Sequence, residues 1–154
     1  MRLHLLCVSR RPASWVTEAG AEYLKRLQGR LEVQVRELPP ATGAAQAEEQ
    51  RQREAETILK AVPAGARLVA LDERGVAWST AELAAELAAW RDEARDVALV
   101  IGGAEGLAES LRKSAVRCWS LSRLTLPHQF ARILVIEQIY RAYSLLNNHP
   151  YHRA

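Results

Sequence analysis

VALVIGGAEG, residues 97–106, is the clearest structural signal in this chain. Residues 97–101 are all apolar, which is typical of a strand that is buried on both faces in the middle of a parallel sheet. Gly102 and Gly103 follow directly, and glycine allows positive φ angles and a close approach of the backbone to a ligand. The stretch therefore predicts a central strand that ends either in a tight turn or in a ligand-binding loop.

Strand-like and helical patterns alternate on both sides of this stretch. Strands are expected at 2–8, 31–35, 67–71 and 116–121, and helices at 14–27, 44–61, 79–91 and 129–146, with a short helix after the glycines. Ser79-Thr80-Ala81-Glu82 is a capping box that opens one of these helices. Alternation of this kind predicts an α/β fold with a mostly parallel sheet flanked by helices.

Two local expectations accompany this pattern. A turn is expected at 72–75, and the helix at 44–61 is expected to be largely solvated because residues 48–56 are very polar. No repeat or low-complexity linker interrupts the chain, so residues 1–154 are expected to form one domain.

Composition limits the class of protein. The chain has 154 residues, 49% of them hydrophobic and 25% charged, which is ordinary for a soluble globular protein. No apolar run approaches the ~20 residues of a membrane span, and the first residues lack the features of a signal peptide. Cys7 and Cys118 have no metal-ligand spacing and are expected to be buried thiols, so we expect a cytoplasmic protein without a metal centre. A net charge of +3 is a mild indication of a polyanionic partner.

Three strand ends carry unusual loops, at Leu71-Asp72, at 101–106 and at 121–128. Ligands bind beyond the carboxyl ends of parallel strands, so these loops are expected to meet at one edge of the sheet. The glycines match neither the dinucleotide-binding pattern nor a phosphate loop, which argues against nucleotide phosphates as the ligand. His128 should lie in the first turn of the last helix, where it is either a structural group or a catalytic one.

The end of the chain combines a very apolar helix with a polar tail. The helix at 129–146 has apolar residues on more than one face, so it is either central or covered by a partner chain. Trp15 and Tyr23 are expected to pack in the core rather than stack on bases. Tyr151, His152 and Arg153 can donate hydrogen bonds, stack or titrate, and a helix cap does not explain them.

Three longer motifs together resemble one known family. They are residues 99–107, LVIGGAEGL, residues 119–128, WSLSRLTLPH, and residues 148–153, NHPYHR, and the similarity extends over nearly the whole chain. The sequence is similar to the ribosomal RNA large subunit methyltransferase H family. It departs from that family at Ala104, where proline is expected, and at Arg123, where a smaller residue is common. A Lys/Gly-rich loop of the family is replaced here by residues 41–45.

The resemblance implies a fold and a reaction. The expected fold is of the SPOUT type with a C-terminal trefoil knot, in a homodimer. The expected activity is transfer of a methyl group from S-adenosylmethionine to N3 of a pseudouridine in 23S rRNA, within the assembled ribosome and not on DNA or at a membrane. By position, the cofactor residues are Leu71, Gly102, Gly103, Leu121, Ser122, Arg123, Leu124, Thr125 and Leu126.

The resemblance also leads to hypotheses about catalysis. His128 is expected to act as a base or to orient the substrate, and Arg153 to hold a phosphate or the developing negative charge. Tyr151 and His152 could stack on the target base or donate hydrogen bonds to it. The base itself stays open between His128, Glu105 and the tail, and the tail of one chain could reach the cofactor of the other. The alternatives are a SPOUT methyltransferase that acts on tRNA and a non-catalytic ribosome-binding factor.

Overall fold

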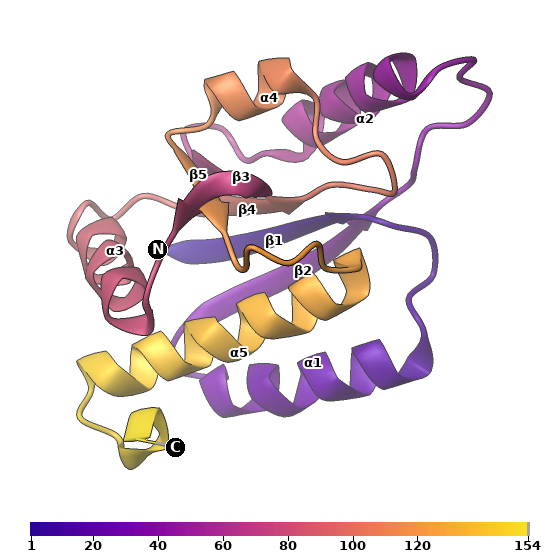
Figure 1. The fold of residues 1–154 in the computed structure, drawn as a ribbon. Helices are drawn as coiled ribbons and strands as arrows, with labels where there is room; N and C mark the ends of the chain where they lie inside the picture. Colours follow the sequence, from indigo (N-terminus) through magenta and orange to yellow (C-terminus); the bar gives the residue numbers. More distant parts are fainter. Residues whose placement is uncertain (154) are drawn as a thin grey trace.

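A five-stranded parallel sheet lies between two layers of helices in the computed structural model, which describes residues 1–153 (Figure 1). The strands are β1 (Arg2–Val8), β2 (Glu32–Leu38), β3 (Arg67–Ala77), β4 (Val97–Ile101) and β5 (Arg117–Ser120). Their order in the sheet is β2-β1-β4-β3-β5, and every neighbouring pair is parallel. The predicted α/β fold with a parallel sheet is confirmed.

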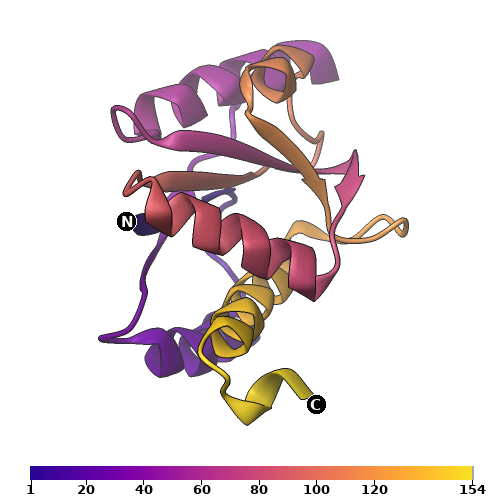
Figure 2. The same ribbon diagram turned by 90° about the vertical axis from the view of Figure 1, so that its left-hand side faces the viewer.

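The helices cover both faces of the sheet (Figure 2). On one face lie α1 (Ser14–Leu27), α3 (Thr80–Asp92) and α5 (His128–Leu146), and on the other lie α2 (Ala47–Ala61) and α4 (Glu109–Ser114). A short 3₁₀ helix, η1 (Pro150–Arg153), follows α5. The capping box that was expected at α3 is present, because Ser79 Oγ accepts a hydrogen bond from the Glu82 amide at 3.1 Å and the Ser79 amide donates to Glu82 Oε2 at 2.7 Å.

Strand β4 lies in the middle of the sheet, between β1 and β3, as its apolar sequence predicted. All five of its residues are buried. Val97, Leu99 and Ile101 contact the α1, α3 and α5 layer, while Ala98 and Val100 contact the α2 and α4 layer. Full burial of a Val, Leu or Ile side chain is worth about 1.5–3 kcal/mol, so this strand anchors both halves of the core.

Two local expectations were wrong, the turn at 72–75 and the burial of Trp15. Residues 72–75 form a bulge within β3 instead of a turn, since Leu71 and Val76 both pair with Trp119 of β5. Helix α2 is largely solvated as expected, since only Glu54, Ala55 and Ile58 of its 15 residues are buried, although the burial of Glu54 was not anticipated. Trp15 is 45% exposed, whereas Tyr23 packs against the core as expected.

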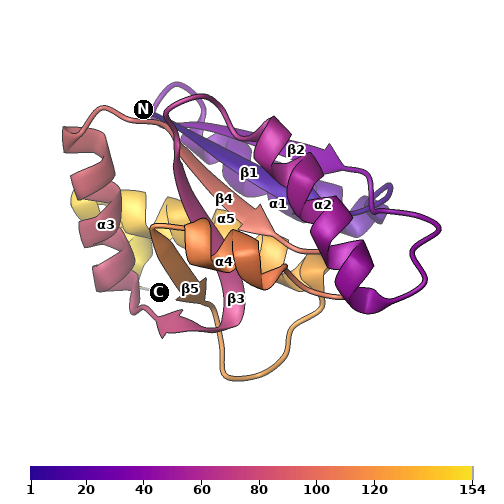
Figure 3. The same cartoon turned by 90° about the horizontal axis from the view of Figure 1, so that it is seen from above.

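The segment after β5 leaves the edge of the sheet and returns to the start of α5. Figure 3 shows this loop, residues 121–127, extending outward from the sheet before it reaches α5. The loop therefore joins the edge strand to a helix that packs on α1 and α3. The trefoil knot that the resemblance implies stays a prediction.

Candidate active site

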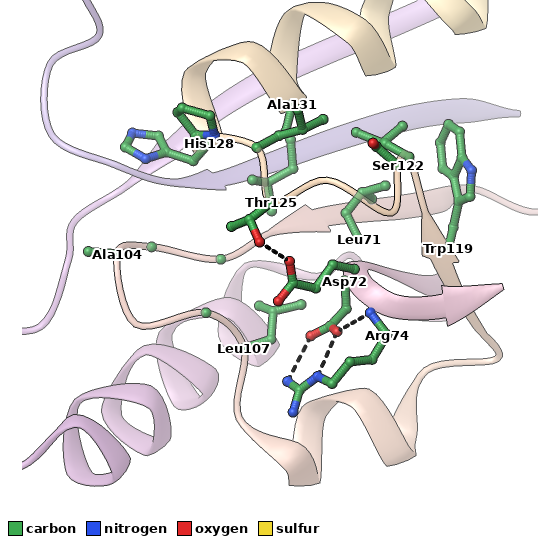
Figure 4. A pocket seen from close by; sticks show the side chains of 18 of the residues that line it. Leu71, Asp72, Arg74, Ala104, Leu107, Trp119, Ser122, Thr125, His128 and Ala131 are labelled. Atoms are coloured by element: carbon green, nitrogen blue, oxygen red, sulfur yellow. Dashed lines mark hydrogen bonds and ion pairs between the residues drawn. The ribbon is translucent and has the colours of Figure 1, made fainter. Parts of the chain in front are cut away.

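A pocket of about 610 Å³ lies at the carboxyl edge of the sheet, where the three unusual loops come together (Figure 4). This volume is in the range of small-molecule sites, about 300–1,000 Å³. The pocket is lined by residues 71–74, 101–107, 121, 122 and 124–128, together with Trp119 and Ala131. Loops that are up to 57 positions apart in sequence, from Leu71 to His128, thus form one cavity, as the parallel topology predicted.

The glycine loop is closely packed at its first two positions, and most closely at Gly102. A Cβ on Gly102 would lie 2.8 Å from the carbonyl carbon of Gly106 and 3.0 Å from Leu107 Cδ2. A Cβ on Gly103 would lie 3.1 Å from Val8 Cγ1. The loop closes on itself through a 3.0 Å hydrogen bond from the Gly106 amide to the Gly103 carbonyl. A side chain is therefore excluded at Gly102 and crowded at Gly103, and the backbone itself forms this wall of the pocket.

Glu54 on α2 packs against the glycine loop at Gly103. Its Oε1 accepts hydrogen bonds of 3.1 Å from the Ala41 amide and from Gln50. Its Oε2 is buried without a hydrogen-bond partner in the described residues, 3.2 Å from the position of a Cβ on Gly103. The role of Glu54 was not predicted from the sequence. One signal in the sequence pointed to the burial of Glu54: it lies four residues before Ile58, and residues four apart share one face of a helix.

The opposite wall of the pocket carries Asp72, whose carboxylate is held by two arginines. Burial would raise the pKa of Asp72, but hydrogen bonds from the Arg74 side chain and amide, with the charges of Arg74 and Arg112, lower it overall. The Asp72 carboxylate is therefore ionised at neutral pH. Glu73, Arg74 and Glu105 also line the pocket, so acidic residues outnumber basic ones in its lining.

Loop 121–127 is fixed by hydrogen bonds of its own. Ser120 Oγ donates to the Ser122 carbonyl, and the Leu124 amide donates to Ser122 Oγ, both at 2.9 Å. Thr125 Oγ1 donates to Glu73 Oε2 at 2.7 Å (Figure 4). Every cofactor residue expected from the resemblance lines the pocket except Arg123, which is exposed and lies outside the lining.

His128 is the first residue of α5 and lines the edge of the pocket. Figure 4 shows its ring directed outward at this edge, above Ala104. No hydrogen bond of the described residues holds the ring, so the imidazole can turn toward a ligand. This placement fits either of the roles that were expected for it.

The tail lies far from the pocket of its own chain. Tyr151, His152 and Arg153 form η1 at the other end of α5, and 19 helical residues span about 28 Å. Tyr151 donates to Glu137 Oε1 at 3.1 Å, and its ring centre lies 4.6 Å from that of Tyr140. Burial and hydrogen bonds with Tyr23 and Glu137 raise the pKa of Tyr151, so its hydroxyl stays protonated. The structure thus brings together His128 and the cofactor loops but not the tail.

The comparisons with known proteins agree with this geometry. The family model described as "Predicted SPOUT methyltransferase" matches residues 1–152. This chain belongs to the SPOUT methyltransferase family. Its activity is therefore methyl-group transfer.

Two curated relatives match this SPOUT methyltransferase from end to end. It is 46% identical over 155 residues to "Ribosomal RNA large subunit methyltransferase H" of Methylococcus capsulatus, covering 99% of this chain and 100% of the relative. It is 45% identical over 156 residues to the protein of the same name in Burkholderia mallei, with 100% of both chains covered.

Two solved structures show the same fold at low sequence identity. A putative methylase family protein from Neisseria gonorrhoeae aligns with a TM-score of 0.55 and 17% identity, covering 90% of this chain and 81% of the other. A probable methyltransferase from Bordetella pertussis aligns with a TM-score of 0.58 and 16% identity, covering 92% and 96%. At such identities the likeness extends to the SPOUT fold alone.

Two further findings concern the described part of this SPOUT methyltransferase. No helix within residues 1–153 is both long and apolar enough to cross a membrane. The same residues contain no group of three or more His, Cys, Asp or Glu side chains arranged to hold a metal ion.

Proposed function

We propose that this SPOUT methyltransferase uses S-adenosylmethionine to methylate N3 of a pseudouridine in 23S rRNA, on the assembled ribosome in the cytoplasm. The observation that carries the proposal is the pocket made by the three loops, in a chain that aligns end to end with proteins named as large subunit rRNA methyltransferases. The lining of the pocket supports S-adenosylmethionine as the methyl donor. The name of the relatives supports ribosomal RNA as the class of substrate.

The pocket residues suit S-adenosylmethionine. When bound, the donor supplies a methyl group that is already activated on a positively charged sulfonium. Glu73 and Glu105 favour a cation in the cavity, while Asp72 is already paired with Arg74, the one arginine of the lining. Leu121, Leu124 and Leu126 supply apolar surface for an adenine ring and a methionine chain, and the backbone at Gly102 and Gly103 permits close contact.

The remaining chemistry is removal of the N3 proton while donor and acceptor are held in line. His128 lies at the edge of the pocket, where its ring can accept that proton or hold the base in place. Glu105 is the other candidate base within the same chain. Arg153 would stabilise the negative charge that develops on the base, and Tyr151 and His152 would contact the base itself.

A homodimer is needed if the tail takes part. No tail residue lines the pocket of its own chain, and Tyr151 contacts Glu137, about 14 Å along α5 from His128, so we infer that the tail completes the pocket of another chain. Trp15, Phe130 and Leu134 are 45%, 52% and 40% exposed, and the rings of Trp15 and Phe130 lie 5.2 Å apart. This apolar surface on α1 and α5 suits a two-fold interface. If the α5 helices pack antiparallel there, the tail of one chain approaches the start of α5 in the other.

Methyl transfer to ribosomes tests the proposal. Purified 70S ribosomes from a strain that lacks the modification are incubated with the protein and S-adenosylmethionine that carries a labelled methyl group. We expect label at one pseudouridine of 23S rRNA, mapped by mass spectrometry. Gly102→Val is the inactive control, because its side chain would meet the Gly106 backbone.

Parallel reactions separate the alternatives. Free 23S rRNA shows whether the assembled particle is required, and tRNA tests the other substrate class. Label on tRNA and none on ribosomes would overturn the choice of substrate. A protein that binds ribosomes but shows no S-adenosylmethionine binding by calorimetry would be a non-catalytic ribosome-binding factor.

A further inference from the structure

Three arginines near the pocket have no partner among the residues that the structure describes. Most arginines here pair with carboxylates, for example Arg132 with Glu37 and Arg141 with Glu137. Arg10, Arg11 and Arg123 are exposed, and none of them has a hydrogen bond or an ion pair with any other residue in 1–153. Their guanidinium groups are therefore available to an outside ligand.

Arg10 and Arg11 lie beside the glycine loop. They follow β1, and Val8 at its end is the residue that a Cβ on Gly103 would meet at 3.1 Å. Ser9 is fixed between them and the strand, because its amide donates to the Leu38 carbonyl at 3.0 Å and its hydroxyl donates to Glu37. Arg10 and Arg11 follow Val8 by two and three residues, and that length of extended chain spans at most about 7–11 Å. Both arginines therefore stay close to the edge of the pocket.

Arg123 lies in the loop that forms another wall of the same pocket. Its neighbours Ser122 and Leu124 line the cavity, while Arg123 itself does not. The hydrogen bonds of Ser122 and Thr125 fix the loop on both sides of it. The resemblance assigned Arg123 to the cofactor, but its exposed side chain suits a ligand outside the cavity better.

The charges separate the inside of the pocket from its surroundings. Asp72, Glu73 and Glu105 line the cavity together with one arginine, Arg74, which is paired with Asp72. Acidic groups therefore outnumber basic ones in the lining, which favours a cationic donor there. The unpaired arginines lie outside the cavity, on the glycine-loop side and on the side of loop 121–127. An RNA that presents one base to the pocket has its backbone phosphates on either side of that base, where guanidinium groups can bind them.

We propose that Arg10, Arg11 and Arg123 bind backbone phosphates of the RNA next to the target base. The inference rests on the proposed function and adds the residues that hold the substrate. Arg10 and Arg11 contact the backbone on the side of the glycine loop, and Arg123 contacts it on the side of loop 121–127. They contribute affinity and orientation, and they carry no base specificity.

Steady-state kinetics on 70S ribosomes test this assignment. The double variant Arg10→Ala/Arg11→Ala is compared with Lys60→Ala/Arg95→Ala, which removes the same charge from exposed residues at the opposite edge of the sheet. We expect the first to raise KM for ribosomes on the order of tenfold, and the control to change it less than twofold. The dependence of log KM on log salt should become shallower by roughly 0.7–0.9 for each phosphate that the protein no longer neutralises.

Arg123→Ala separates the two roles that Arg123 could have. We expect a higher KM for ribosomes with an unchanged Kd for S-adenosylmethionine, measured by calorimetry without RNA. A raised Kd with an unchanged KM for ribosomes would assign Arg123 to the cofactor and overturn its part of the proposal. For the arginine pair, a KM and salt dependence equal to those of the control variant would overturn it. If the wild-type protein methylates no ribosomal RNA, the proposed function itself fails, and that result is seen before any variant is compared.

Discussion

Thr125 Oγ1 donates a 2.7 Å hydrogen bond to Glu73 Oε2, which joins loop 121–127 to β3 across the pocket. The two residues are 52 positions apart in sequence, and both line the cavity. The bond therefore restrains two walls that would otherwise be connected only through β5. Because it holds two walls of the cavity together, we expect it to slow the release of a bound ligand.

Thr125→Val keeps the shape of the side chain and removes this donor. A hydrogen bond contributes about 0.5–1.5 kcal/mol, so we expect the Kd for S-adenosylmethionine to rise about two- to tenfold, mainly through faster dissociation. Calorimetry and stopped-flow fluorescence measure the two quantities. Thr57→Val removes a comparable hydroxyl from the exposed surface of α2 and is the matched control. Equal dissociation rates in the two variants would show that the bond does not restrain the ligand.

Gly103→Ala should disturb the floor of the glycine loop. The new Cβ would lie 3.1 Å from Val8 Cγ1 and 3.2 Å from Glu54 Oε2, and such overpacking costs about 1–3 kcal/mol. We expect lower stability in urea unfolding and weaker S-adenosylmethionine binding. Adding Val8→Ala removes one of the two crowded contacts, so the double variant should lose less than the sum of the single losses. Strict additivity would place the strain elsewhere.

Mixed dimers test whether the tail acts on the other chain. The Arg153→Ala variant has an intact pocket but lacks the guanidinium group of the tail. The Gly102→Val variant has an intact tail but a blocked pocket. Each variant alone should be inactive. In a random mixture half of the dimers are mixed and each of these has one complete site, so we expect about a quarter of wild-type methyl transfer. Mixed dimers as inactive as either parent would contradict a tail that works between chains.

Acid should weaken the protein partly through Asp72. The hydrogen bonds and charges of Arg74 and Arg112 lower its pKa in the folded state, whereas the unfolded value is about 3.9. Its contribution to stability is thus present above that value and is lost as the pH falls through the folded pKa. We expect wild type to exceed Asp72→Asn in free energy of unfolding at pH 6, with a smaller difference at pH 2–3. Asp92→Asn controls for the loss of one charge, and a constant difference across this range would exclude the ion pairs as the cause.

Local patterns were sufficient for most of the secondary structure. The apolar run 97–101 was identified as the central strand because a strand covered on both faces has no position for a polar side chain. The capping box at Ser79 and Glu82 was readable because its two hydrogen bonds involve residues only three apart. Such features depend on neighbours in the chain and so are encoded locally.

Other features depended on contacts between distant segments. The bulge at 72–75 exists because β5 pairs with β3 on both sides of it, and Gly75 would bring a Cβ within 2.4 Å of the Cys118 carbonyl oxygen. Glu54 was missed because a glutamate in a polar helix is ordinarily solvated, and its burial depends on the loops at 41 and 103 that pack over it.

In the candidate site, too, some features follow from local sequence patterns and others from tertiary packing. Periodicity, the glycines and the polar tail were sufficient to name the loops and the residues that could carry chemistry. Strand order and the length of α5 then placed His128 in the pocket, Arg123 outside the lining and Tyr151 at the far end of the helix. The reason is physical: side-chain pattern reports which face of an element is buried, whereas the distance between two loops is set by how the elements pack, and no local pattern records that.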